Sequence, residues 1–142
     1  MKFFFDNNMS PNLAKAMQIL AEKDNKGKST DDQVQITHLR DRFEQNIADE
    51  EWIPQLALDP SWIVISGDRN ITRNPIRKQV LLKSCLTAFF LQSTWPQLQI
   101  WEFAWQFIRR WPLIVERAGK SRPGSLYLVR YGKSLVIDDL QL

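Results

Sequence analysis

The sequence predicts an α/β protein with a central, mostly parallel sheet. Two observations carry this prediction: strand-like and helix-like patterns alternate four times within residues 2–91, and the strand-like segments are short apolar runs. The chain has 142 residues, of which 44% are hydrophobic and 25% charged, and this suits one compact domain with a substantial core. We therefore expect a single domain over residues 1–142.

The first strand and the first helix are predicted by an apolar run and a capping signal. Residues 2–6 form a bulky apolar run that ends at a polar group, which is typical of a strand buried on both faces. Ser10 is a suitable N-cap and Pro11 suits the first helical position, so we expect a helix from here to about Glu22. Residues 23–33 are polar and predict a surface loop.

The second and third strands are predicted on either side of another helix. Apolar and polar residues alternate over residues 34–39, which predicts a short strand, and a charged connection follows at residues 40–48. A helix is expected from there, over residues 49–58. The β-branched run at residues 62–65 is the clearest strand in the sequence, and it ends at Ser66-Gly67-Asp68.

A fourth helix-and-strand pair completes the alternation. Asn74 and Pro75 repeat the cap-and-proline signal, so a helix is expected to about Lys83, with a strand following at residues 86–91. The single cysteine, Cys85, lies in this apolar stretch and is expected to be a small buried thiol.

The rest of the chain predicts a long amphipathic helix over residues 96–116, with Pro112 as a point where it can break. We expect its apolar face to pack in the core rather than to stack on bases. The residues of this face are Leu98, Trp101, Ala104, Trp105, Ile108, Trp111 and Val115. Alternating apolar residues on both sides of Gly132 and Lys133 predict a small terminal hairpin.

Positive charge is concentrated in this last segment. The net charge of the chain is only +3, but seven basic residues lie between Trp105 and Lys133 against a single acid, Glu116. A segment of this kind suits a polyanionic partner. The seven residues are Arg109, Arg110, Arg117, Lys120, Arg122, Arg130 and Lys133.

Three aspartates occupy positions where α/β proteins place ligand-binding groups. Asp6 and Asp68 come just after two buried strands, and ligands of open parallel sheets bind beyond the carboxyl ends of the strands. Asp49 heads the helix between the second and third strands, so its loop can reach the same end of the sheet. Three carboxylates that converge would repel one another unless they shared a divalent cation. The sequence therefore predicts a Mg²⁺ or Mn²⁺ centre.

Metal-assisted hydrolysis of a phosphodiester is the reaction that such a centre favours, because a bound divalent ion activates water and stabilises the leaving oxygen. Zinc fits less well, since Cys85 and His38 are the only cysteine and histidine in the chain. Four nearby basic residues are candidates to hold the phosphate backbone. They are Arg69, Arg73, Arg77 and Lys78.

Each of these positions also has an ordinary structural explanation. Aspartates at strand ends often cap helices or make turns, and Asp49, at the head of a helix, is the clearest example. The basic residues at 69–78 are equally consistent with a solvated helix face. His38 lies within a strand pattern, where a structural role is more common than a catalytic one.

The order and spacing of these motifs resemble those of the PIN-like nuclease superfamily and, within it, the VapC-type toxins of bacterial toxin–antitoxin systems. Phe4 to Pro11 resembles the opening strand, metal-binding aspartate and helix, and Asn8 matches an asparagine two residues after that aspartate. Residues 38–41 and 48–53 resemble the second strand and the middle acidic motif, and residues 62–71 are similar to the third strand and the final acidic turn.

This resemblance covers residues 2–91 and implies a PIN-like α/β/α sandwich, so residues 95–142 are interpreted as a C-terminal helix and hairpin extension. It also implies an Mg²⁺- or Mn²⁺-dependent ribonuclease, often dimeric, that a cognate antitoxin neutralises. By position, Asp6, Asp49 and Asp68 are the catalytic metal-binding residues and Glu50 is a supporting ligand. The residues expected to contact substrate are Asn8, Arg69, Arg73 and Arg77.

The larger members of the family carry a further acid between the first and second motifs. In this sequence the candidates for that position are Glu22, Asp24, Asp31 and Asp32.

Two other classes of protein share part of this pattern. A catalytically inactive PIN-like module would bind RNA or a protein through its basic C-terminal segment. A phospho-receiver domain also has aspartates at the ends of its first and third strands. It requires an acidic pair after the first strand and a lysine after a fifth parallel strand, and we expect neither here.

The apolar run at the start of the sequence is too short for a signal peptide or a membrane span. We therefore expect a soluble, cytoplasmic protein without a membrane partner.

Overall fold

The structure is a computed structural model that describes residues 1–67 and 69–142. Asp68, one of the three predicted metal-binding aspartates, lies outside the described residues. The strands are β1 (Lys2–Phe5), β2 (Gln35–His38), β3 (Trp62–Ser66), β4 (Thr87–Leu91), β5 (Leu126–Val129) and β6 (Ile137–Asp139). The α-helices are α1 (Pro11–Asp24), α2 (Asp49–Leu56), α3 (Asn70–Arg73), α4 (Pro75–Ser84) and α5 (Ile100–Gly119).

The strands form one sheet in the order β2-β1-β3-β4-β5-β6, in which β6 alone runs antiparallel to its neighbour. This confirms the predicted α/β class with a mostly parallel sheet. The chain passes from β1 outward to β2 and then returns to the other side of β1 to form β3. The strand order thus reverses between β1 and β3, and doubly wound sheets bind their ligands at such a switch point, beyond the carboxyl ends of the strands.

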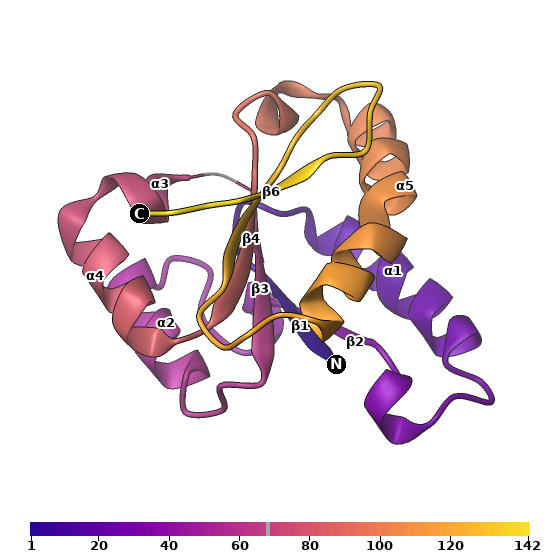
Figure 1. The fold of residues 1–142 in the computed structure, drawn as a ribbon, viewed down its shortest axis with the longest axis horizontal. Coiled ribbons are helices and arrows are strands. Elements are labelled where there is room, and N and C mark those ends of the chain that lie inside the picture. Colours follow the sequence, from indigo (N-terminus) through magenta and orange to yellow (C-terminus); the bar gives the residue numbers. More distant parts are fainter. Residues whose placement is uncertain (68) are drawn as a thin grey trace.

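Helices cover both faces of the sheet, which Figure 1 shows nearly edge-on between α1 and α5 on one side and α2 and α4 on the other. The three consecutive phenylalanines of β1 explain why its sequence is apolar throughout. Phe3 and Phe5 join the core beneath α1 and α5, whereas Phe4 joins the core beneath α2 and α4. Successive side chains of a strand point to opposite faces, so only an uninterrupted apolar run can fill both cores.

The predicted capping signals are confirmed at two helices. The Ser10 hydroxyl accepts a hydrogen bond from Leu13 N (3.2 Å) at the start of α1. The Asn74 side chain accepts hydrogen bonds from Ile76 N (3.0 Å) and Arg77 N (3.1 Å) at the start of α4. These side chains satisfy amide groups that have no partner within the helix itself.

The prediction that Cys85 is buried is wrong, because Cys85 is exposed at the C-terminal end of α4. Cys85 has a left-handed backbone (φ 56°), which ends the helix before β4 begins. The apolar side chains on either side of it, Leu81 and Leu86, fill the core instead.

The apolar face predicted for α5 is only partly correct. Trp111 packs against Phe3, with ring centroids 4.6 Å apart, but Trp101 is 83% exposed and Trp105 is 51% exposed. The residues buried against the sheet are Phe103, Gln106, Phe107, Arg110, Ile114 and Ala118. Aromatic and aliphatic residues occur on both sides of this helix, so periodicity alone did not identify the side that faces the sheet.

The α5 helix is also continuous through Pro112 and ends three residues later than predicted, at Gly119. It connects β4 to β5, which pairs in parallel with β4 before it turns into β6. The predicted terminal hairpin is therefore present, but its first strand is also a fifth parallel strand, which the sequence did not lead us to expect. In the described part of the chain, no helix has the length and apolar character needed to cross a membrane.

Not every basic residue between Trp105 and Lys133 is available to a polyanionic partner. Arg110 is fully buried, and its guanidinium donates to the carbonyl oxygens of Arg130 (3.0 Å) and Gly132 (2.7 Å). Burial lowers the pKa of Arg110, and these carbonyl groups stabilise its charge. Arg110 thus holds the loop between β5 and β6 and is not accessible to a polyanion.

Candidate functional site

The ends of β1 and β3 meet at the point where the strand order reverses. Phe5 pairs with Ile65, and Asp6 N donates to Ile65 O (3.0 Å). Asp6 and Ser66 are therefore neighbours at the carboxyl end of the sheet, by which we mean the end where the five parallel strands finish. This is the position at which the sequence predicted Asp6.

The Asp6 side chain is buried, with 3% of the residue exposed. Its Oδ1 atom accepts hydrogen bonds from Asn8 N (3.1 Å) and Gly67 N (3.2 Å), and its Oδ2 atom accepts one from the Ser66 hydroxyl (2.5 Å). The carboxyl group is thus held by donors from both strand ends. Buried polar groups of this kind are costly without such donors.

Gly67 allows the two strand ends to approach this closely. A Cβ atom on Gly67 would lie 2.6 Å from Asn8 O and 2.8 Å from the Asn8 Cβ atom. Real Cβ atoms do not make contacts this short, so a side chain at position 67 would push the two loops apart. The requirement for glycine is therefore steric.

His38, at the end of β2, supports the loop that follows Asp6. Its Nε2 atom lies 2.7 Å from Met9 O, and its Nδ1 atom accepts from Arg40 N (3.1 Å). These partners require a neutral ring with the proton on Nε2. Burial is the main reason that the pKa of His38 is lowered, so the neutral form is favoured, and the structural role expected for His38 fits these contacts.

A second loop reaches the same end of the sheet. Asn7 Nδ2 donates to Gln45 O (2.6 Å), and Arg40 Nε donates to Asn7 Oδ1 (3.1 Å). These contacts tie the connection between β2 and α2 to the loop after β1. The helix α2 begins directly after this connection, so Asp49 lies toward the carboxyl end of the sheet, where the sequence predicted it.

Asp49 and Glu50 begin α2, but neither is its N-cap, since Ala48 occupies that position. Asp49 Oδ1 accepts from Trp52 Nε1 (2.9 Å), and Asp49 Oδ2 lies 3.5 Å from Arg77 Nη1. Arg77 Nε also donates to Glu50 Oε1 (2.5 Å). This hydrogen bond is the main reason that the pKa of Glu50 is lowered.

The predicted substrate-binding residues have different surroundings. Arg77 bridges two acidic side chains, Arg73 is exposed, and the Asn8 side chain lies at the surface beside Asp6. Arg69 Nε is buried, and within residues 1–67 and 69–142 it has no hydrogen-bond partner. An unsatisfied guanidinium nitrogen is a suitable donor for an anionic oxygen.

The four candidates for a further acid lie elsewhere. They occur at the end of α1 and in the connection to β2, which places them at the amino end of the sheet, opposite Asp6. Two of them have local partners, since Asp24 pairs with Lys28 (2.8 Å) and Asp32 accepts from the Ser29 hydroxyl (3.0 Å).

The carboxylate oxygens of Asp6, Asp49 and Glu50 are of the type that Mg²⁺ and Mn²⁺ prefer, so the donor chemistry fits such an ion. Among the described residues, which exclude position 68, no three histidine, cysteine or acidic side chains are grouped closely enough to hold a metal. The structure brings Asp6 together with Ser66 and Gly67, and Asp49 with Glu50 and Arg77.

Ser66 and Gly67 were not singled out as site residues from the sequence. Both contact the Asp6 carboxyl group and therefore belong to the site. Their position directly after a strong strand pattern was the available signal, but residues at a strand end are just as often ordinary turn residues.

The model of the family described as "PIN like domain" matches residues 1–93. The chain therefore belongs to the PIN-like domain family, and its three-layer α/β/α arrangement agrees with that family's fold. This family is of the nuclease type. Searches of curated proteins and of solved structures found no match to this chain.

Proposed function

We propose that this protein is a metal-dependent endoribonuclease that hydrolyses phosphodiester bonds in RNA. The observation that carries this proposal is the buried Asp6 carboxyl group at the point where the strand order reverses, held by donors from two neighbouring strand ends. Membership of a nuclease-type family supports the proposal independently.

In this proposal Asp6, Asp49 and Asp68 hold Mg²⁺ or Mn²⁺, with Glu50 as a supporting ligand. The bound ion would supply an activated water and would stabilise charge on the phosphate in the transition state. Ser66 and Gly67 orient the Asp6 carboxyl group. Arg69, whose Nε atom has no hydrogen-bond partner among the described residues, and the exposed Arg73 and Asn8 are the candidates to bind the substrate.

Arg77 has a different role in this proposal from the one its sequence position suggested. Its guanidinium contacts both Asp49 and Glu50, which leaves it less suited to bind a substrate phosphate. We assign Arg77 the role of holding the two acidic side chains near each other in fixed orientations, since a cation between two carboxylates offsets their mutual repulsion.

The direct test is cleavage of single-stranded RNA by purified protein with Mg²⁺ or Mn²⁺. EDTA and the substitution Asp68→Asn should each abolish cleavage, while the circular dichroism spectrum stays that of the folded protein. Asp31→Asn is the matched control, because Asp31 is exposed at the opposite end of the sheet and should leave cleavage unchanged. Full cleavage by the Asp68→Asn protein would refute the metal assignment.

A catalytically inactive module is the second candidate function. It is favoured by the engagement of Asp49 and Glu50 with Arg77, a contact that neutralises two of the proposed ligands. A wild-type protein that binds RNA with a steep dependence on salt, yet cleaves none with either metal, would identify this function.

We also propose that the enzyme is the toxin of a toxin–antitoxin system, acting in the cytoplasm and neutralised by a cognate antitoxin. Homodimer formation is part of the same proposal. A small antitoxin reading frame beside this one, together with growth arrest on expression of the wild type and not of Asp6→Asn, would support it. Normal growth on expression of a protein that cleaves RNA in vitro would argue against the toxin role.

A further inference from the structure

Two tryptophans of α5 project into solvent at the start of that helix. Trp101 is 83% exposed and Trp105 is 51% exposed, although aromatic side chains of this size are usually largely buried. They are four residues apart, so they lie in one row along the helix, and Arg109 continues that row. The guanidinium of Arg109 lies over the Trp105 ring, 5.9 Å from its centroid.

The loop after β5 completes this surface and fixes its shape. Arg109 Nη2 donates to Lys133 O (3.2 Å), while Trp105 Nε1 and the Tyr131 hydroxyl both donate to Glu102, at 2.7 and 3.1 Å. A shallow pocket lies between the helix and the loop, lined in part by Trp105, Arg109, Tyr131 and Lys133. We name Trp101, Trp105, Arg109, Tyr131 and Lys133 together the aromatic-basic surface.

The aromatic-basic surface lies at the same end of the sheet as Asp6. The helix α5 starts from the connection that follows β4, and the loop that carries Tyr131 and Lys133 follows β5, so both emerge from carboxyl ends of parallel strands. Tyr131 N donates to Gln92 Oε1 (3.0 Å), which joins the two connections. Figure 1 shows the start of α5 and the loop between β5 and β6 together beyond this end of the sheet.

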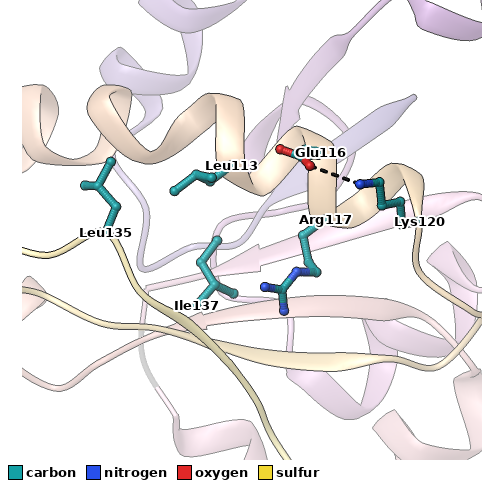
Figure 2. Close-up of a pocket in the computed structure, with 6 residues that line it drawn as sticks. All are labelled: Leu113, Glu116, Arg117, Lys120, Leu135 and Ile137. Carbon is teal, nitrogen blue, oxygen red and sulfur yellow. Dashed lines mark hydrogen bonds and ion pairs between the residues drawn. The ribbon is translucent and has the colours of Figure 1, made fainter.

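The charges of α5 differ between its two halves. Figure 2 shows the second half, where Glu116 pairs with Lys120 (3.0 Å) and Arg117 points toward β6. Arg117 lies 3.8 Å from Asp139 and, in the β5–β6 hairpin, Arg130 pairs with Asp138. Arg109 and Lys133 have no ion pair within the described part of the chain, so positive charge is available beside the exposed tryptophans.

We propose that the aromatic-basic surface binds single-stranded RNA, with bases stacked on Trp101 and Trp105 and phosphates bound by Arg109 and Lys133. Exposed aromatic rings next to unpaired cations are the combination that single strands require, because every base offers a ring face and every linkage a negative charge. Glu102 is the one acid of this region that contacts the surface residues in the described chain, and three side-chain donors engage it.

This inference deepens the proposed ribonuclease function and rests on it for the identity of the substrate. The surface would hold the strand on one side of the candidate site and so contribute to binding without contacting the reacting phosphate. Trp101, Trp105, Arg109 and Lys133 are therefore predicted to affect RNA affinity and KM rather than kcat.

The test is a binding titration in EDTA, so that no metal-dependent cleavage occurs, with a fluorescently labelled 15-nucleotide uridine RNA. Trp101→Ala and Trp105→Ala should each weaken binding about fivefold or more. Arg109→Gln and Lys133→Gln should each lower the slope of log affinity against log salt by about 0.7. Arg122→Gln is the matched control, since Arg122 is also without an ion pair in the described chain but lies beside the amino end of β5.

A duplex RNA of the same length should bind the wild type more weakly, because its bases are stacked and paired. If both tryptophan variants bound the single strand as tightly as the wild type does, the inference would be overturned, even if the wild type cleaves RNA. It would also be overturned by sedimentation showing that Trp101 and Trp105 mediate self-association while RNA affinity is unchanged in their variants. If the variants lose affinity but the wild type cleaves nothing, the surface inference stands and the proposed nuclease function fails.

Discussion

The two groups of acidic residues at the carboxyl end of the sheet are held in opposite ways. Asp6 is buried and receives hydrogen bonds from two backbone amides and a hydroxyl, which are uncharged donors. Asp49 and Glu50 are partly exposed at the start of a helix and face the cation of Arg77. The Asp6 position is therefore built into the sheet, whereas Asp49 and Glu50 share a contact with one side chain of another helix, Arg77.

The largest effect on stability is expected at Asp6. Asp6→Ala removes the acceptor for Ser66, Gly67 and Asn8, so the free energy of unfolding should fall by about 2 to 4 kcal/mol. Urea denaturation measures this change, and Asp31→Ala, at an exposed position, should stay within about 0.5 kcal/mol of the wild type. A rise in stability in Asp6→Ala would show instead that the buried carboxyl group costs the fold energy.

Gly67→Ala should have the next largest effect, because its new Cβ atom would contact the backbone of Asn8 at 2.6 Å. We expect a loss of about 1 to 3 kcal/mol in the free energy of unfolding, as for other overpacked sites. Gly119→Ala is the matched control, since no atom lies within 4 Å of a Cβ built there, and it should have little effect. A Gly67→Ala protein as stable as the wild type would mean that the two strand ends can separate freely.

A smaller, pH-dependent effect is expected from His38, which supports the loop after Asp6. Burial lowers its pKa in the folded state, so the unfolded chain binds a proton more readily than the folded protein does. The contribution of His38 to the free energy of unfolding is fully present above its ordinary pKa of about 6.5. It is lost as the pH falls through the lowered pKa that His38 has in the folded protein. The groups that face the ring are Arg40, whose charge also lowers the pKa, and Asp41, whose charge raises it.

Urea denaturation at several pH values checks this effect. The urea concentration at the unfolding midpoint of the wild type should decrease as the pH is lowered from 7.5 to 5.5. His38→Gln, which has no titrating ring, should show a smaller decrease over the same range. Parallel profiles for the two proteins would assign the pH dependence to other groups.

The smallest effect on stability is expected at the second acidic group. Arg77→Gln removes the hydrogen bond that lowers the pKa of Glu50, so that pKa should rise toward its ordinary value. Because the folded-state pKa is depressed, Arg77 contributes stability above the unfolded pKa of Glu50 and loses it as the pH falls. Carboxyl NMR titration measures the shift, and Arg73→Gln, at an exposed residue, should leave it unchanged. If the pKa of Glu50 were the same in Arg77→Gln as in the wild type, the contrast between the Asp6 group and the Asp49–Glu50 group would be lost.

Much of the framework was predictable because it depends on local patterns. The apolar run of β1, the β-branched run of β3 and the capping signals at Ser10 and Asn74 all specified elements that the structure contains. The position of Asp6 at a strand end followed directly, because the carboxyl ends of parallel strands meet at one end of a sheet. These features are set by a residue and its near neighbours in the chain.

The remaining features depend on contacts between distant residues, and only the tertiary structure decided them. The side of α5 that is buried depends on where the sheet lies, so Trp101 and Trp105 are exposed although their spacing also suited a core. The fifth parallel strand depends on α5 crossing back to pair β5 with β4. The hydrogen bonds from Ser66 and Gly67 to Asp6 and the contact of Arg77 with Glu50 join residues 27 to 61 positions apart, a range at which sequence periodicity carries no information.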